Sequence, residues 1–261
     1  MGAAIWSTEA SQMQQFPARF FIRFFHNHGL LSVNDRPTWH VIKGGSRQYL
    51  EPLTRPFRDN IRVNTPVQCI RRYSDHVEIL TSGEQAERYD AVFIAAHSNQ
   101  ALDMLEHPTD AESEVLKAIP YQRNEAVLHT DTTLLPKRRL AWAAWNYHIL
   151  KQQHDRVALT YNMNILQGID SPHTFNVTLN NSDAIAAEKI LKTIEYDHPV
   201  FTPDSVAAQA RHAEVNGTQR TWYCGAYWRN GFHEDGVVSA LDAVEHFNEA
   251  MYEELHLRRA S

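Results

Sequence analysis

The chain has 261 residues, of which 43% are hydrophobic and 21% are charged, and this ordinary globular composition excludes a disordered chain. The net charge is −6 with histidine neutral, and the basic clusters are short, which excludes a nucleic-acid-binding surface. No apolar stretch approaches the roughly 18 residues of a transmembrane segment, and the N-terminus lacks the pattern of a secretion signal. Two cysteines, Cys69 and Cys224, give no disulfide framework and favour a reducing, cytoplasmic location.

The first predicted element is an aromatic helix. Phenylalanines recur at helical spacing between Ser11 and His28, and Gly29 is placed to end the helix. Packing in a core is the favoured interpretation of this face, and an apolar wall of a substrate cavity is the alternative.

A strand, a turn and a broken helix are predicted next. The strand covers Trp39–Lys43, and a double-glycine turn follows it. Ser46 is a good helix N-cap, and Pro52 and Pro56 are expected to break or kink the helix that it starts.

The following segment has β character and then helical character. Strands are predicted at Val67–Arg72, His76–Thr81 and Tyr89–Ala96, with Gly83 in the turn between the last two. Helices are predicted at Ser98–Leu105 and Asp110–Ala118, with Ser98 and Asp110 as their caps.

An antiparallel sheet with one covered face is predicted in the middle of the chain. Its strands are Asn124–His129, Leu140–Tyr147, Val157–Tyr161 and Phe175–Leu179. Helices are expected at Ala184–Lys192 and Asp204–His212. Candidate substrate contacts, for which sheet packing is the alternative, are Trp142, Trp145, Asn146 and Tyr147.

The most informative stretch is the glycine-rich loop from Gly225 to Gly236. A short apolar strand, Thr221–Cys224, precedes it, and an amphipathic helix is predicted at Leu241–Glu254. The apolar face of that helix would consist of Leu241, Val244, Phe247 and Met251. Such a loop places backbone N–H groups and the positive end of a helix dipole against an anionic ligand group. A glycine turn without a ligand is the alternative.

This strand, loop and helix resemble the C-terminal flavin-contacting motif of FAD-dependent oxidoreductases of the amine oxidase class. The resemblance implies FAD as the cofactor and hydride transfer to it from a small organic substrate, an amine or a lipid-like chain. It also implies that Gly225 and Ala226 lie against the ribityl-phosphate, that Gly236 and Val237 present backbone N–H groups, and that Val67 contacts adenine. The implied cofactor-binding residues are Gly44, Gly45, Val67, Gly225, Ala226, Glu234, Asp235, Gly236 and Val237, and no catalytic residue is identified.

The chain departs from the family pattern in several places. Ala226 stands where many amine oxidases have an acidic residue. Glu234 or Asp235 takes over that role, or else both are ordinary helix-start residues. A water-holding lysine near the flavin is not identified either, since Lys43 and Lys151 are merely available.

The largest departure is the absence of any G-x-G-x-x-G fingerprint. The chain therefore looks like the later part of a family member, either a fragment whose Met1 is internal or a paralogue that has lost its dinucleotide-binding half. The alternative function is accordingly a truncated, non-catalytic remnant or binding module that cannot hold FAD.

The predicted fold class lies between α/β and α+β: a partial FAD/NAD(P)-binding domain joined to a substrate domain with a mixed or antiparallel sheet and packed helices. The cofactor domain would consist of residues 40–100 and 215–257, and the substrate domain of residues 1–39 and 101–214.

Metal chemistry is the rival class, because the chain has 15 histidines. His-Glu-x-x-His, Cys-x-x-Cys and Asp-rich loops are all missing, so no metal site is predicted. A G-x-S-x-G elbow and a P-loop are missing too, which disfavours an α/β-hydrolase and a P-loop enzyme.

Overall fold

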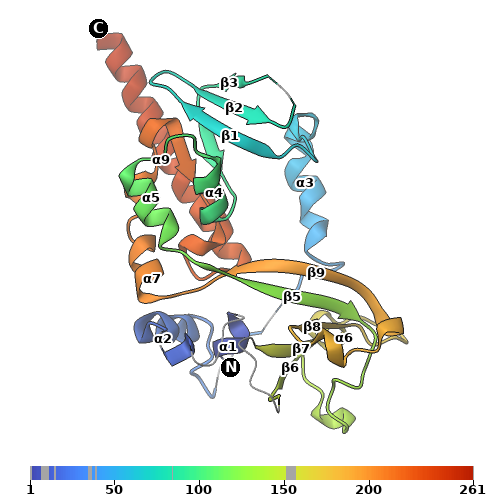
Figure 1. Cartoon of the computed structure of the whole chain (residues 1–261). Coiled ribbons are helices and arrows are strands. Elements are labelled where there is room, and N and C mark those ends of the chain that lie inside the picture. The colour runs from blue at the N-terminus through green and yellow to red at the C-terminus, as the bar shows by residue number, and fades with distance from the viewer. Residues whose placement is uncertain are drawn as a thin grey trace. The chain divides into compact units, whose positions relative to one another are not determined.

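The structure is a computed structural model that describes residues 2–6, 12–14, 16–34, 37–38, 40–83, 85–150 and 157–260 (Figure 1). The chain forms two compact units, each built from two separate segments. Unit 1 consists of Met1–Ile61 and Tyr121–His198, and unit 2 of Arg62–Pro120 and Pro199–Ser261. Helices and mainly antiparallel strands occur in both, which confirms the α+β class. Whether the units correspond to a substrate domain and a cofactor domain stays a prediction.

Unit 1 begins with an aromatic cluster. Two short helices, α1 (Gly2–Ile5) and η1 (Gln12–Gln14), precede α2 (Ala18–Asn27). The ring of Trp6 lies 4.6 Å from that of Phe16 and 4.8 Å from that of Phe24, and all three side chains are buried. The phenylalanines therefore pack together as a core.

Helix α2 is shorter than predicted at its start and ends as predicted. It begins after Pro17, the N-cap residue, and Ser11 lies outside the described residues. At the other end Gly29 has φ +64°, its N–H donates to the carbonyl of His26, and the N–H of Leu30 donates to that of Phe25. These two bonds form a Schellman motif, which confirms Gly29 as the stop.

The segment after α2 has no strand in the part that the structure describes, so the strand predicted at Trp39–Lys43 is wrong for residues 40–43, and Trp39 lies outside that part. The helix near Ser46 is present as η2 (Ser46–Tyr49), α3 (Leu50–Thr54) and η3 (Arg55–Asn60). Its N-cap is Gly45 rather than Ser46. Pro56 is the second residue of η3, where α3 has ended, which agrees with its prediction as a breaker. Pro52 is tolerated in the first turn of α3, where a missing N–H costs little.

The remainder of unit 1 is a five-stranded sheet of order β6-β7-β8-β5-β9. Its strands are β5 (Tyr121–His129), β6 (Trp145–His148), β7 (Ala158–Asn162), β8 (Asn176–Leu179) and β9 (Ile190–Pro199). The pairs β6–β7, β7–β8 and β5–β8 are antiparallel, as predicted. Short helices η4 (Arg139–Ala141) and α6 (Met163–Gln167) lie in the connections.

The helix predicted at Ala184–Lys192 is wrong. Two short turns, η5 (Ser182–Ala184) and η6 (Ala187–Lys189), lead into β9, which lies beside β5 as a long curved pair in Figure 1. The buried carboxylate of Asp131 accepts hydrogen bonds from the N–H of Ala186 and from the ammonium of Lys189. This contact and the open edge of β5 override the helical propensity of the local sequence.

Unit 2 contains two small sheets. The first is the antiparallel meander of β1 (Val67–Arg72), β2 (Val77–Thr81) and β3 (Glu87–Tyr89). The second pairs β4 (Val92–Ile94) in parallel with β10 (Thr221–Tyr223). The strand predicted at Tyr89–Ala96 is thus divided between the two sheets.

Helices of unit 2 surround these strands. They are α4 (Ser98–Met104), α5 (Asp110–Lys117), α7 (Pro203–Gln209), α8 (His212–Val215), η7 (Thr218–Arg220), η8 (Ala226–Trp228) and α9 (His233–Ala260). The caps of α4 and α5 are His97 and Thr109, each one residue before the predicted cap. Thr109 and Glu112 form a reciprocal capping box, which fixes the start of α5.

Helix α9 begins eight residues before the predicted start, and its buried face is not the predicted one. Ala243 packs against Trp222 and Cys224, with Phe247 at the margin of this cluster. Leu241 and Val244 are instead 62% and 44% exposed. Ala240 and Ala243 allow α9 to approach β10 closely, and of the predicted face Phe247 packs against Trp222 whereas Leu241 and Val244 point away. In the described ranges no helix is both long enough and apolar enough to cross a membrane.

Candidate cofactor-binding loop and its supporting networks

The loop after β10 starts with a glycine that no other residue can replace without a clash. A Cβ at Gly225 would lie 2.5 Å from the ring carbon Cε1 of Tyr227. The N–H of Gly225 donates to Ser239 Oγ at 2.8 Å, and the same hydroxyl donates to the carbonyl of Gly236 at 3.0 Å. Because Ser239 is fully buried, this contact fastens the loop to the first turns of α9.

Side chains from two other elements hold the middle of the loop. Gln209, at the end of α7, donates to the carbonyls of Tyr227 at 2.8 Å and Arg229 at 2.5 Å. Arg229 in turn donates to the carboxylate of Asp242 at 2.9 Å. Bonds to backbone carbonyls fix a loop conformation, so this segment is positioned before any ligand arrives.

Asp235 has a structural role in the described residues. Its Oδ2 accepts the N–H of Phe232 at 2.9 Å, and its Oδ1 accepts the side-chain amide of Asn230 at 3.1 Å. This is the capping interaction of a helix start, one of the two alternatives that the sequence leaves open. Glu234 is exposed beside it.

The start of α9 at His233 changes what Gly236 and Val237 can do. The N–H of Gly236 already donates to the carbonyl of Phe232 at 3.1 Å, and Val237 lies one residue further into the helix. The N–H of Gly236 is thus already used within the helix, and contact of Gly236 and Val237 with a cofactor stays a prediction. What Gly236 offers is space, because a Cβ placed on it would meet nothing within 4 Å.

A buried donor lies in the same loop. Trp228 is 4% exposed, and its Nε1 has no hydrogen-bond partner among the described residues. A buried N–H without a partner is rare, and a ligand atom is one explanation for it. The open position at Gly236 and this indole N–H both fit a bound group at the loop.

Of the remaining predicted cofactor residues, only Ala226 belongs to the loop, where it lies in η8 directly after Gly225. Val67 is the first residue of β1, half-buried and paired with Thr81. Gly44 and Gly45, with φ of +83° and +87°, form an exposed turn in unit 1 rather than in unit 2.

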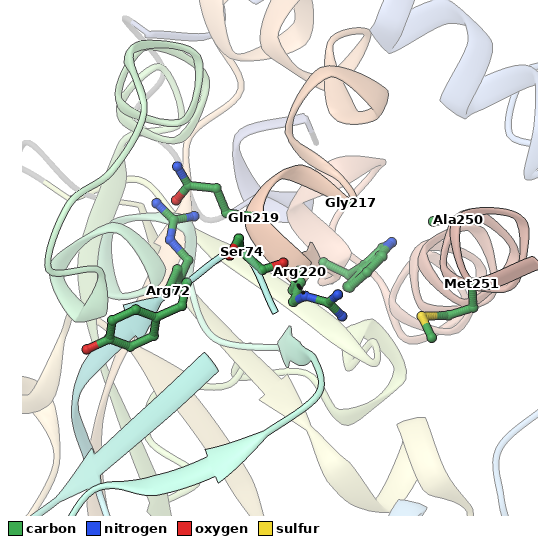
Figure 2. A pocket seen from close by; sticks show the side chains of 9 residues that line it. Arg72, Ser74, Gly217, Gln219, Arg220, Ala250 and Met251 are labelled. Atoms are coloured by element: carbon green, nitrogen blue, oxygen red, sulfur yellow. Dashed lines mark hydrogen bonds between the residues drawn. The ribbon is translucent and has the colours of Figure 1, made fainter. Parts of the chain in front are cut away.

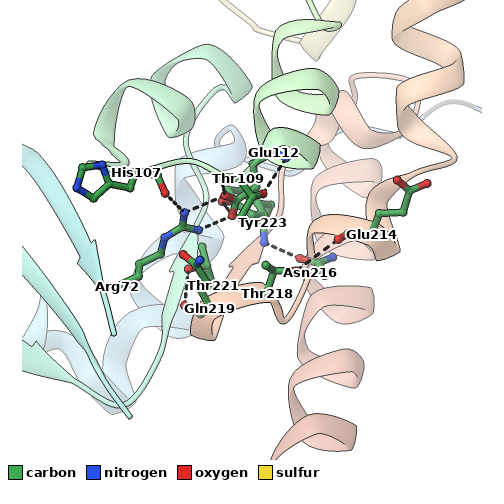
Figure 3. Close-up of polar contacts among 10 residues, drawn as sticks. All are labelled: Arg72, His107, Thr109, Glu112, Glu214, Asn216, Thr218, Gln219, Thr221 and Tyr223. Atoms are coloured by element: carbon green, nitrogen blue, oxygen red, sulfur yellow. Dashed lines mark hydrogen bonds and ion pairs between the residues drawn. The ribbon is translucent and has the colours of Figure 1, made fainter. Parts of the chain in front are cut away.

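A buried ionic network holds the strand that leads into the loop (Figure 3). The guanidinium of Arg72, on β1, donates to both carboxylate oxygens of Glu112, on α5, and to the carbonyl of His107 at 2.6 Å. Tyr223, the last residue of β10, donates its hydroxyl to Glu112 Oε1 at 2.7 Å. Arg72, Glu112 and Tyr223 thus join three elements at one carboxylate.

The charge state of this network follows from its bonds. Burial opposes ionisation of Glu112, but hydrogen bonds from Arg72, the backbone of Thr109 and Tyr223 outweigh it and lower the pKa of the carboxyl. Burial and the adjacent carboxylate raise the pKa of Tyr223. The network therefore holds one carboxylate, one guanidinium and one neutral phenol.

In unit 1, strand β6 separates the predicted substrate residues onto two faces. Trp145 and Tyr147 are 40% and 48% exposed, and the ring of Trp145 lies 5.3 Å from that of Tyr161. Asn146 is buried on the opposite face, where it donates to the carbonyls of Ala143 and Thr160. Trp142 precedes the strand, and its Nε1 donates to the carbonyl of Pro136.

Sequence reasoning missed a chain of hydrogen bonds that crosses four strands of this sheet. His129 Nε2 lies 2.7 Å from Thr178 Oγ1, which lies 2.8 Å from Thr160 Oγ1, which lies 2.8 Å from His148 Nε2. Both threonines and His129 are fully buried. A signal was available in the sequence, because residues two apart on a strand share one face of the sheet. Three neighbouring strands each have a polar pair at this spacing: Asn146 and His148, Thr160 and Asn162, Asn176 and Thr178.

One backbone group fixes the direction of this chain. The N–H of Asp131 donates to His129 Nδ1 at 3.1 Å, so the ring hydrogen of neutral His129 is on Nε2. His129 then donates to Thr178, Thr178 to Thr160, and Thr160 to His148 Nε2. The hydrogen of neutral His148 is therefore on Nδ1. Burial lowers the pKa of both histidines, which favours these neutral forms.

The side chains that a metal site or a water-holding lysine would need are not brought together. In the part of the chain that the structure describes, no three His, Cys, Asp or Glu side chains could hold a metal ion together. Lys43 is exposed in the turn before Gly44, and Lys151 lies outside the described residues.

Similarity to known proteins is found in the fold and not in the sequence. No protein-family profile and no curated protein sequence matches the chain. Its structure is similar to cyclohexylamine oxidase from Brevibacterium oxydans, with a TM-score of 0.64, 12% identity and 97% of this chain covered. It is also similar to a putative protoporphyrinogen oxidase from Exiguobacterium, with a TM-score of 0.60, 14% identity and 96% covered. A fatty acid isomerase from P. acnes covers 78% of the chain, with a TM-score of 0.53 and 16% identity.

The chain spans 63%, 62% and 52% of the lengths of these three structures, respectively. At these identities the similarity establishes the fold, which is that of part of an amine oxidase-type protein.

Proposed function

We propose that the chain is part of an FAD-dependent oxidoreductase of the amine oxidase class, which oxidises or desaturates a small organic substrate. When bound, FAD supplies the hydride-accepting chemistry, and the protein binds, orients and shields the reacting groups. The similarity to two oxidases over nearly the whole chain supports the class, and the open position at Gly236 is the observation that carries the cofactor assignment.

The argument from Gly236 is energetic. A glycine inside a helix is about 1 kcal/mol less favourable than alanine. At Gly236 no neighbouring group excludes a methyl, and the backbone is not left-handed. The described structure therefore contains no reason for glycine at this position, whereas close contact with a cofactor would supply one.

Each remaining part of the loop has a role in this proposal. Gly225 and Ala226 bring the backbone close to the cofactor. Ser239 and Gln209 hold the loop in shape, and Trp228 Nε1 is a buried donor for a cofactor oxygen or nitrogen. Val67, Gly44 and Gly45 remain proposed contacts, without a supporting observation of this kind.

Unit 1 is proposed to bind the substrate. Trp145 and Tyr147 offer exposed aromatic surface for an apolar chain or ring. His148 lies on the opposite face of the strand, where it bonds to Thr160, and is not part of this surface. A substrate with an apolar body fits Trp145 and Tyr147.

The test is the visible absorption spectrum of the purified chain after incubation with excess FAD and desalting. A retained flavin band supports the proposal, and its complete absence contradicts it for this polypeptide. Gly236→Leu should abolish retention, because its side chain fills the open space without straining a helical backbone. Gly236→Ala should weaken retention less while raising the melting temperature.

Ser239→Ala is the matched control for loop shape. It leaves the space at residue 236 open but removes the anchor of Gly225, so its effect on FAD retention should be accompanied by a lower melting temperature. If Gly236→Leu retains flavin as well as the unchanged chain does, the cofactor does not lie against α9.

The second candidate is a non-catalytic remnant or binding module. Two observations favour it: the sequence has no dinucleotide fingerprint, and β4 and β10 form a parallel sheet of only two strands. Parallel sheets this small are uncommon, because both faces need covering. A chain that melts cooperatively as a monomer, yet retains no flavin, would favour this candidate.

A further inference from the structure

One helical segment of unit 1 buries none of its own side chains. It consists of η2, α3 and η3 with the residues next to them, residues 41–61, and we call it the arm. In the three helices of the arm no residue is buried. A helix of a globular protein normally buries one apolar face. The arm therefore has a surface that the described residues leave uncovered.

The uncovered surface includes an apolar stripe. Leu50 and Leu53 lie one turn apart in α3, and Phe57 and Ile61 continue the spacing of four residues into η3 and just beyond it. Residues three or four apart are neighbours on the surface of a helix. Leu53 is 64% exposed, and the other three are between 43% and 51% exposed. Two more exposed apolar residues precede the glycine turn of the arm: Val41 and Ile42.

Basic side chains accompany the stripe. The arm contains four basic residues and two acidic ones, so its net charge is +2, whereas that of the whole chain is −6. Arg55 pairs with Glu51 at 2.9 Å. The other three basic residues are exposed and form no ion pair within the described part of the chain: Lys43, Arg47 and Arg58.

The basic groups of unit 2 are used differently. Arg220 lines a cavity of about 500 Å³ (Figure 2), where its guanidinium donates to the carbonyls of Ser74 and Asp90. Arg72 lines the same cavity and pairs with Glu112. These guanidinium groups join parts of unit 2 to one another, whereas the unpaired cations of the arm face solvent.

A second exposed stripe, on α9, has the opposite charge. Val237, Leu241 and Val244 are exposed there at helical spacing. Between His233 and Tyr252 the helix contains five acidic residues and neither lysine nor arginine. Exposed apolar residues thus occur in both units, and the basic residues beside them are particular to the arm.

An anionic lipid surface fits the arm better than a protein groove does. Apolar residues combined with lysine and arginine are the pattern of helices that lie in the interface of a membrane. The arm is also irregular, because 3-10 turns flank α3 and Phe57 has a non-helical φ of −134°. A protein groove packs against the regular ridges of a helix. Lipid head groups and chains adapt to an irregular segment.

We propose that the arm is a docking surface for a membrane that contains anionic lipids. Leu50, Leu53 and Phe57 enter the boundary between head groups and acyl chains, and the three unpaired cations pair with lipid phosphates. The segment lies on the membrane without crossing it. This role is independent of FAD, since the glycines proposed as cofactor contacts, Gly44 and Gly45, are not used in it.

The test is flotation of the full chain with lipid vesicles in a density gradient, which separates lipid-bound protein from aggregated protein. Vesicles of phosphatidylcholine are compared with vesicles that also contain about 30% phosphatidylserine. We expect the chain to bind the anionic vesicles at least about tenfold more tightly than the neutral ones. Binding should weaken as the ionic strength rises toward about 1 M, because salt screens the attraction to the head groups.

Two double variants test the two parts of the arm. Leu53→Ser with Phe57→Ser removes apolar side chains, and Arg47→Gln with Arg58→Gln removes two positive charges. Each should weaken binding to the anionic vesicles about tenfold or more. All four side chains are exposed, so both variants should keep the melting temperature of the unchanged chain.

Matched controls carry the same substitutions elsewhere. Leu241→Ser with Val244→Ser alters the stripe of α9, and Lys117→Gln with Lys192→Gln removes two exposed charges outside the arm. Both controls should bind the anionic vesicles as the unchanged chain does.

Four results would overturn the proposal. Neutral vesicles bind as tightly as anionic ones, either arm variant binds as the unchanged chain does, or no chain floats at about 1 mM lipid. The fourth result concerns a second copy of the chain as the occupant. In that case sedimentation velocity would show a dimer that Leu53→Ser with Phe57→Ser converts to a monomer, and the unchanged chain would not bind vesicles.

Discussion

The two units bury polar groups in different ways. Unit 2 buries a charged network, in which Arg72 and Tyr223 meet one carboxylate of Glu112. Unit 1 buries a neutral chain, in which two histidines and two threonines donate to one another in a single direction. A buried ion pair loses most when one partner is removed, because a bare charge stays behind. A neutral chain loses only the bonds that are broken, so its members are more tolerant of change.

The largest expected effect is at Glu112. Glu112→Gln removes the negative charge but leaves Arg72 buried, so it should lower the free energy of unfolding by about 3–5 kcal/mol. Urea denaturation measures this change. Glu106→Gln is the matched control on an exposed pair with Arg71, and it should change stability little because water and salt screen that pair. Equal effects of the two variants would contradict the comparison.

A smaller effect is expected in the neutral chain. Thr178→Val interrupts it and leaves the hydrogen of His129 Nε2 and the hydroxyl of Thr160 short of a partner, at a cost of about 1–3 kcal/mol. The double variant Thr160→Val with Thr178→Val should cost less than the sum of the single variants, since the second change removes a group that the first had already left unsatisfied. Strict additivity would show that the two threonines do not interact.

The same chain predicts a tautomer. Nitrogen chemical shifts of the histidine rings at neutral pH should place the hydrogen of His129 on Nε2 and that of His148 on Nδ1. In Thr160→Val, His148 loses the donor that fixes its tautomer and should become a mixture. If the unsubstituted protein has the hydrogen of His148 on Nε2, hydrogen-bond donation does not run from His129 to His148.

As the pH falls, the hydrogen-bond chain of unit 1 should lose its contribution to stability before the ionic network of unit 2 does. The folded-state pKa values of His129 and His148 are lowered, so their contribution to stability is complete above pH 6.5, the unfolded value, and is lost as the pH falls below it. The folded-state pKa of Glu112 is lowered too, so its contribution is complete above pH 4.5 and is lost only as the pH falls further.

Hydrogen exchange, corrected for its intrinsic pH dependence, can separate the two units. Between about pH 7 and pH 5.5, protection should fall in β7 and β8 before it falls in β1 and β2. Asp131 lies beside His129 and partly offsets its pKa shift, and His212 is a half-buried histidine of unit 2 whose pKa is also lowered by burial. The measurement is therefore made in a His212→Gln background. Earlier loss of protection in β1 would reverse the assignment.

Local signals predicted much of the fold. Strand β1 has the predicted bounds, Val67–Arg72, because β-forming residues lie between turn signals. Gly29 ends α2 because only a left-handed residue completes the Schellman motif. The helix predicted at Ala184–Lys192 is wrong for the opposite reason: its conformation is decided by β5 and by Asp131, which are remote in sequence and leave no local pattern.

The candidate site was predictable only in part. The glycine-rich segment marks the loop, since residues with special backbone geometry are visible in a sequence. Its supports are not visible, because the partners Glu112 and Tyr223 are 111 residues apart and Gln209 bonds to the carbonyl of Arg229 at a separation of 20. The start of α9 at His233 is not predicted because Asp235, whose carboxylate accepts the N–H of Phe232 at that start, is open to two interpretations in the sequence.

Strand β10 has only three residues, so it is about 10 Å long. Its last residue, Tyr223, bonds to Glu112, and two residues later the N–H of Gly225 bonds to Ser239. The ionic network and the loop are therefore joined by one short strand, and thermodynamic linkage applies to them: whatever free energy a ligand on the loop adds to the stability of the network, the intact network adds to the affinity of the loop.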